Sequence, residues 1–308
     1  APGEIEALYR RDADRAGVCH ESGLLVVGRC TPVLDGKVGE AEYAFSSAGF
    51  LGSGGALSQR QGRIALGYDD QRLYLAVSSP LTPVPRPGAG ETAKAGRLEV
   101  YLAPVTARQP LYRFTLAAAG TVAATRDGDT PWPCAGVETR HAVADGTWTA
   151  EAAIPFAALG LDHAPEGQNW RANVARIFTA PPEVTTLAPV VGGPDDWSHF
   201  LTMRFRHDTP TVRIAGFVDV AGRALQVDVS ASSGPANTVT GCIYSSTGRA
   251  YEDRTTAFTL WADGRATPFR PLRSPVGAET RYQLALDEKV GADSVPLFRG
   301  SYVFDPAE

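Results

Sequence analysis

The residues that could carry out catalysis do not form a recognised arrangement in this chain. His20 and Glu21 are adjacent, as in a zinc-protease motif, but no second histidine follows four residues on. The segment 52–55 resembles part of a phosphate-binding loop, yet Leu57 stands where the last glycine would be. The sequence has no GxSxG nucleophile elbow or P-loop, and its acidic residues are too scattered to nominate a catalytic pair. We therefore expect a protein that is not an enzyme.

Trp132 is a candidate binding residue because it stands between two prolines, where we expect at least partial exposure. It could be a ligand platform, an anchor for a protein partner or a lid on the core. Aromatic and arginine side chains supply much of the energy of protein interfaces, so Tyr9, Arg10 and Arg11 are further candidates for partner contact.

The stretch from Gly146 to Leu161 contains the clearest structural signal. Side chains over 148–154 alternate with a period of two, and both sets are mostly apolar, apart from Glu151. This pattern predicts a strand that is covered on both faces. Pro155 ends the strand because it has no N–H for the ladder, and one helical turn over the sheet edge is expected after it.

The same alternation recurs along the chain, with turn residues between the runs. Asp69 to Gln71 joins two predicted strands, and Asp145-Gly146 is a signal for a type I′ hairpin. The strand pattern restarts after Asp208 to Pro210. We therefore predict an all-β protein with two tandem antiparallel β-sandwiches, covering 31–207 and 211–308, after a helical and loop extension over 1–30 with its helix over 4–16.

Bulk properties exclude some classes of function. A net charge of −5 without a basic run argues against nucleic acid, and no apolar run approaches the roughly 20 residues of a membrane helix. The start APGE, without Met, is typical of signal cleavage, so an exported, periplasmic or extracellular protein is expected.

The four cysteines predict at most one disulfide. Cys19 and Cys30 could close a short loop, whereas Cys134 and Cys242 are expected to be free and buried. No pair has zinc-ligand spacing.

An ordered set of motifs over residues 30–206 resembles the carbohydrate-binding module family 9-like (DOMON-related) β-sandwiches. The central GTWTAEAAIPFAALGL is similar to that family's GWT.E.AIPF..LG segment. The other similar segments are PVLDGKVGEAEY, RLEVYLAP, YRFTLAAAGTV, NWRANVARI and DDWSHF. Residues 211–308 resemble only generic bacterial immunoglobulin-like modules.

The resemblance implies extracytoplasmic sugar binding between two aromatic rings. Trp197 fits the position of the ring near the domain's end, and sugar faces stack on indole through their apolar C–H groups. The loop that usually supplies the other ring, 80–96, contains no aromatic residue, and Trp132 could reach in from the neighbouring loop. Arg176 and Glu99 are the residues we expect to hydrogen-bond hydroxyl groups.

The family also places the strands of Glu151 and Arg176 close together. If both side chains point inward they must pair, because an unpaired buried charge costs several kcal/mol. Such a pair would fix strand register or form the polar floor of a cleft.

Cofactors are not expected, although the resemblance raises two. Family members often carry structural calcium, for which the loop aspartates 127, 129, 195 and 196 are candidates, but Asp-rich turns are common without metal. Related DOMON proteins bind haem, for which Met203 with His141, His199 or His207 would be the ligands.

Two functions from different classes remain open. The first is a non-enzymatic accessory subunit that docks on a protein partner or on the periplasmic face of a larger assembly. The second is a glycan-binding accessory protein that uses Trp197, Trp132, Arg176 and Glu99.

Overall fold

A computed structural model describes residues 23–304 except 40, 53–54, 59, 82–95, 105–109, 119, 180, 191–192, 220–224, 233–237, 247–253, 261–266 and 270–279. The predicted helix over 4–16, Cys19 and nearly all of the loop 80–96 lie outside the described residues. Among the described residues, no helix is long and apolar enough to cross a membrane.

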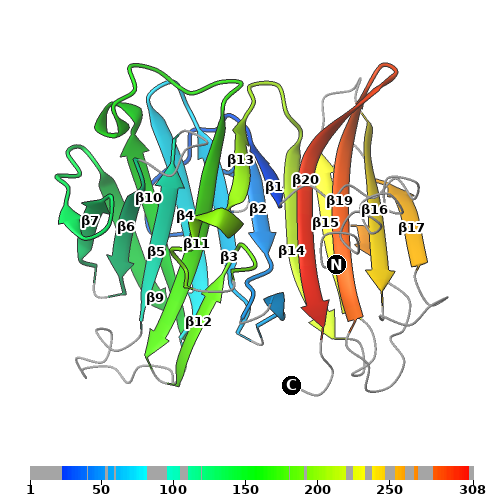
Figure 1. Cartoon of the computed structure of the whole chain (residues 1–308), viewed down its shortest axis with the longest axis horizontal. Coiled ribbons are helices and arrows are strands. Elements are labelled where there is room, and N and C mark those ends of the chain that lie inside the picture. Colours follow the sequence, from blue (N-terminus) through cyan, green and yellow to red (C-terminus); the bar gives the residue numbers. More distant parts are fainter. Residues whose placement is uncertain are drawn as a thin grey trace, which may run out of the picture.

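The described chain is all-β, as predicted, and its strands form two facing sheets (Figure 1). The larger sheet has 12 strands in the order β17 (Arg254–Thr259), β16 (Thr238–Ser246), β19 (Thr280–Val290), β20 (Asp293–Phe304), β1 (Leu24–Val27), β13 (Leu201–Phe205), β11 (Asn169–Thr179), β5 (Arg97–Ala103), β6 (Tyr112–Ala117), β7 (Val122–Arg126) and β8 (Thr130–Pro131), with β12 (Pro182–Thr186) paired to β11. The smaller sheet has eight in the order β18 (Thr267–Phe269), β15 (Leu225–Ser232), β14 (Thr211–Asp219), β2 (Phe45–Ala48), β3 (Arg63–Tyr68), β4 (Arg72–Pro80), β10 (Thr147–Pro155) and β9 (Glu138–Ala144).

Strand β10 confirms the central sequence signal. It pairs with β4 on one side and with β9 on the other, and its core residues are buried on both faces. Trp148 and Ile154 enter the main core between the sheets, whereas Ala153 joins a smaller apolar cluster on the outer face. The strand ends at Pro155, and a 3-10 turn, η3 (Phe156–Leu159), follows it as predicted.

The hairpin before β10 is also confirmed. Asp145 and Gly146 have φ values of 50° and 71°, which are the left-handed conformations that a type I′ turn needs at both central positions.

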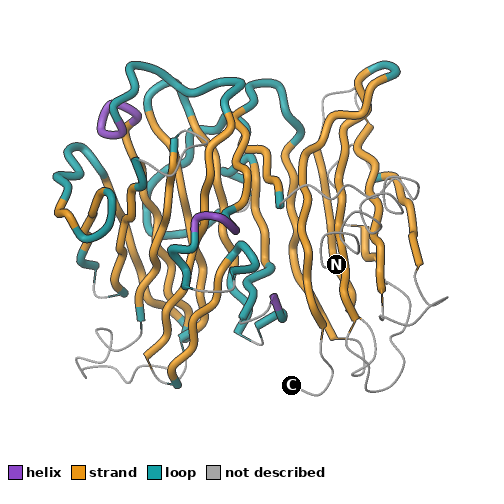
Figure 2. Tube along the Cα trace, viewed as in Figure 1, coloured by secondary structure: helices purple, strands orange, loops and turns teal. Residues whose placement is uncertain are grey.

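Both sheets continue past the predicted boundary at Asp208 to Pro210. Strand β1, from the predicted N-terminal extension, pairs in parallel with β13 and antiparallel with β20. In the other sheet, β2 pairs in parallel with β14. Each sheet is therefore continuous from the first half of the chain into the second, and Figure 2 shows the strands of both halves side by side.

Side chains join the two halves as well. The rings of Phe45 and Phe298 stack with centroids 5.9 Å apart. The guanidinium of Arg206 lies 2.5 Å from the carboxylate of Glu288, whose side chain is only 1% exposed. The stacked rings bury apolar area at the junction, which stabilises the two halves against each other. The buried Glu288 carboxylate depends on Arg206 for its countercharge, so each half also needs the other to satisfy a buried charge.

Candidate functional site

The candidate site lies on the outer face of the larger sheet, over β5, β6 and β11. Alternation along β5 sends Leu98 and Val100 into the core and places Glu99 and Tyr101 on the opposite face. A second 3-10 turn, η4 (Trp197–His199), lies over this face, drawn in purple in front of the strands in Figure 2.

Two residues of β11 hold the segment that carries η4. Asn173 is fully buried, donates from Nδ2 to the carbonyl of Pro194 at 3.0 Å, and accepts from the N–H of Ala188 at 3.0 Å. Arg171 donates to the carbonyl of Ser198 at 3.1 Å. Because these anchors stand on a central strand, the position of Trp197 is fixed by the sheet.

Trp197 is half-buried and packs on an apolar cluster of Tyr101, Ala175 and Phe200. The rings of Tyr101 and Phe200 are 5.7 Å apart. Part of the Trp197 indole is therefore packed against this cluster, while the rest of it remains exposed.

The η4 turn is held together by polar contacts at its start. Asp196 accepts hydrogen bonds from the Ser198 hydroxyl at 2.6 Å and pairs with the His199 ring at 2.8 Å. Its bonds with Ser198 and then His199 lower the pKa of the Asp196 carboxyl.

Charged groups stand beside the aromatic cluster. Glu99 is 6% exposed and accepts from Arg97 Nε at 2.7 Å and from the hydroxyl of Tyr101. Burial, followed by this bond to Glu99, raises the pKa of Tyr101. Arg113 lies opposite Tyr101 across the β5–β6 pairing and donates to Asp129 at 2.6 Å. Burial lowers the pKa of Arg113. The bond to Asp129 and the nearby Glu99 and Tyr101 outweigh this effect and raise the pKa overall.

The structure brings together two of the four residues that we predicted to bind a ligand. Glu99 accepts from the Tyr101 hydroxyl, and Trp197 packs on the cluster that contains Tyr101, so both lie on the same face. Trp132 is half-buried and packs on the core side of β6, with its ring centre 4.8 Å from that of Tyr112 and 5.7 Å from that of Phe114, so it does not share the face of Glu99 and Trp197.

Arg176 also lies away from this face. It is 1% exposed and points between the sheets, where its guanidinium stands 3.9 Å from the centre of the Phe50 ring and donates to Thr185 at 3.1 Å and to the carbonyl of Arg60. Burial lowers its pKa to about 9, although the charge of Glu183 acts in the opposite direction.

The expected pair between Glu151 and Arg176 is wrong. Glu151 belongs to β10 of the smaller sheet and faces outward, where the N–H groups of Asp35 and Gly36 and the hydroxyl of Tyr43 bind its carboxylate. Arg176 belongs to β11 of the larger sheet and faces inward. Each is satisfied separately, because an arginine can be held by carbonyls, hydroxyls and rings, and a carboxylate by N–H and O–H donors.

The candidate metal and haem ligands are dispersed. Among the residues described, no three His, Cys, Asp or Glu side chains are grouped so that they could hold a metal ion. Met203 is 1% exposed in the core, whereas His141, His199 and His207 are exposed. Cys134 and Cys242 are free and half-buried.

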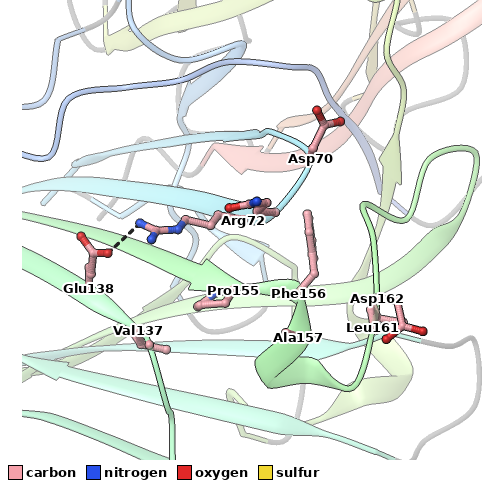
Figure 3. A pocket seen from close by; sticks show the side chains of 11 residues that line it. Asp70, Arg72, Val137, Glu138, Pro155, Phe156, Ala157, Leu161 and Asp162 are labelled. Atoms are coloured by element: carbon pink, nitrogen blue, oxygen red, sulfur yellow. Dashed lines mark ion pairs between the residues drawn. The ribbon is translucent and has the colours of Figure 1, made fainter.

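A separate pocket of about 440 Å³ opens at the end of the smaller sheet (Figure 3). It is lined by the start of β4, the segment before β9 and the η3 turn. Arg72 and Glu138 form an ion pair at 2.8 Å on its wall, with Pro155 and Ala157 nearby and Asp70 and Asp162 at its rim. Trp197 and Glu99 do not line this pocket.

Sequence reasoning missed Tyr101, Arg113, Asn173 and Arg171. A signal for Tyr101 was present, because a residue two positions after Glu99 on a strand must share its face. The other three act through cross-strand neighbours and a distant loop, which a single strand's pattern does not reveal.

No family model matches the sequence, and no curated protein matches it either. Solved structures similar to this one include a carbohydrate binding module family 9 from Caldicellulosiruptor kristjanssonii in complex with cellotriose, at 15% identity over 60% of this chain and 94% of that chain, with a TM-score of 0.45. A putative carbohydrate-binding protein from Bacteroides uniformis is similar at 14% identity over 60% of this chain and all of that chain, also with a TM-score of 0.45. A two-domain fibronectin type III segment of chicken tenascin covers 79% of this chain at 11% identity, with a TM-score of 0.21.

Proposed function

We propose that this protein is a non-enzymatic, extracytoplasmic binding protein that holds a sugar ring of an oligosaccharide on the outer face of the larger sheet. The observation that carries the proposal is that Trp197, half-buried on a fixed apolar base, shares one face with the buried carboxylate of Glu99. An exposed part of an indole can stack on a sugar's apolar face, and groups held on strands do not need to be ordered on binding.

The polar groups on this face suit hydroxyl recognition. Glu99 orients Arg97, whose side chain is 45% exposed, and the partly exposed Arg113 stands on the same face, opposite Tyr101 in the β5–β6 pairing. Planar guanidinium groups can donate two parallel hydrogen bonds to neighbouring oxygens.

Trp197→Ala is expected to weaken oligosaccharide binding by about 10- to 100-fold, because the mutation removes the stacking surface. Isothermal calorimetry of the full chain against cello-, xylo- and manno-oligosaccharides measures this. Trp132→Phe is the matched control, since Trp132 packs on the core side of β6 and its substitution should leave affinity unchanged. Equal affinities of Trp197→Ala and the unmutated chain, or no binding to any of these sugars, would contradict the proposal.

A protein partner in a larger extracytoplasmic assembly is the second candidate for the same face. Tryptophan and arginine are among the side chains enriched at interface hot spots, and Trp197, Arg97 and Arg113 provide them here. Co-purification with a large complex from the source organism, unaffected by added oligosaccharide and lost in Trp197→Ala, would favour this candidate over the first.

A further inference from the structure

Strand β9 is the longest edge strand in the described part of the chain. It has seven residues, contains no proline, and pairs with β10 in an unbroken register. The strands at the other sheet ends are shorter. Strand β8 has two residues, one of them Pro131, and β18 has three, one of them Pro268, whereas β17 has six. Short strands and prolines discourage further pairing at an edge, and β9 has neither feature.

The turn before β10 fixes which backbone groups of β9 face outward. In a two-residue hairpin the residues flanking the turn, here Ala144 and Thr147, form a hydrogen-bonded pair, and every second pair after it does the same. The N–H and C=O groups of Thr139, His141 and Val143 therefore point away from β10. Among the described residues, one hydrogen bond to these six groups is found. The Arg140 guanidinium donates to the carbonyl of Thr139 at 2.8 Å.

These six groups are complementary to those of an identical strand. In an antiparallel pair centred on His141, Thr139 of one copy lies opposite Val143 of the other, and His141 lies opposite itself. All six donors and acceptors of each copy then find partners. On the outer face, Glu138 and Arg140 lie opposite Ala144 and Ala142, so each long side chain meets a methyl group.

We propose that the β9 edge is a homodimer interface, in which a second copy of this chain pairs antiparallel about a two-fold axis at His141. The strand is accessible, since five of its seven residues are exposed, including Val143 at 40%. The contact is isologous, as closed dimers require, and it joins the two smaller sheets into one continuous sheet.

Sedimentation equilibrium of the full chain at about 100 μM, where a micromolar interface would be mostly occupied, tests the proposal. The expected mass is twice the 32.6 kDa of one chain. His141→Pro removes one N–H at the centre and should give monomers, whereas His141→Ala keeps the backbone and should remain dimeric. A monomer for the unmutated chain, or dimers in His141→Pro, would overturn the proposal.

Cysteine cross-linking tests the register without relying on the proline variant. His141→Cys places one thiol beside its counterpart at the axis and should form a disulfide-linked dimer on mild oxidation. Thr139→Cys alone faces Val143 of the other copy and should stay largely uncross-linked. Equal cross-linking of both variants, or a yield no higher than that of the unmutated chain, would contradict this register.

Discussion

Replacing Glu151 by alanine is expected to lower the free energy of unfolding by about 4 kcal/mol, because the mutation leaves two buried donors and one partly buried donor without an acceptor. The Glu151 side chain is fully buried on the outer face of β10. Its carboxylate accepts from the N–H groups of Asp35 and Gly36 at 3.0 and 2.7 Å and from the Tyr43 hydroxyl at 2.8 Å. These bonds attach the segment 35–43 to the smaller sheet, so the loss would also release that segment.

Urea unfolding followed by circular dichroism measures this effect. Tyr43→Phe removes one of the three donors and should cost only about 1 kcal/mol, because the carboxylate keeps its two N–H partners. If Glu151→Ala costs no more than Tyr43→Phe, the carboxylate does not hold this segment as described.

Glu288→Ala is expected to destabilise the whole chain by about 3 kcal/mol, because it breaks an ion pair whose carboxylate is buried. Arg206 follows β13 in the first half and Glu288 belongs to β19 in the second. The side chain of Arg206 is 25% exposed and can partly turn to water, which keeps the cost near the lower end of the range for buried pairs.

The unfolding of Glu288→Ala should be a single transition at lower urea, with fluorescence and circular dichroism coinciding. This follows because β1–β20 and β2–β14 continue both sheets across the junction. Lys289→Ala is the matched control, since its side chain is exposed and its loss should change stability by less than about 0.5 kcal/mol. Two separate transitions, with only the later strands affected, would show instead that the halves unfold independently.

The strands were predictable because each one carries its own signal. Alternation identified β10, and the hairpin turn and Pro155 fixed its two ends. The same signal could not show that β1 lies between β13 and β20. That arrangement depends on parallel and antiparallel pairings between segments far apart in the sequence, which no local period encodes.

The wrong pairing of Glu151 with Arg176 has a similar cause. A period of two tells which residues of one strand share a face, but not which sheet that strand joins or which face meets the core. Glu151 and Arg176 belong to different sheets and face in different directions. For the candidate site, the sequence and its family resemblance suggested Glu99 and Trp197 as candidates, together with Trp132 and Arg176, whereas the supporting Asn173 and Arg171 became visible only with the chain folded.

Hydrogen–deuterium exchange of the full chain, with and without a bound oligosaccharide, tests most directly where the ligand binds. We expect exchange to slow over β5, over β6 and over the segment 194–200 that carries Trp197, with little change at β9. Slower exchange at Asp70 to Arg72, at Gly136 to Glu138 and over η3, with none around Trp197, would place the ligand in the end pocket and contradict the proposed site.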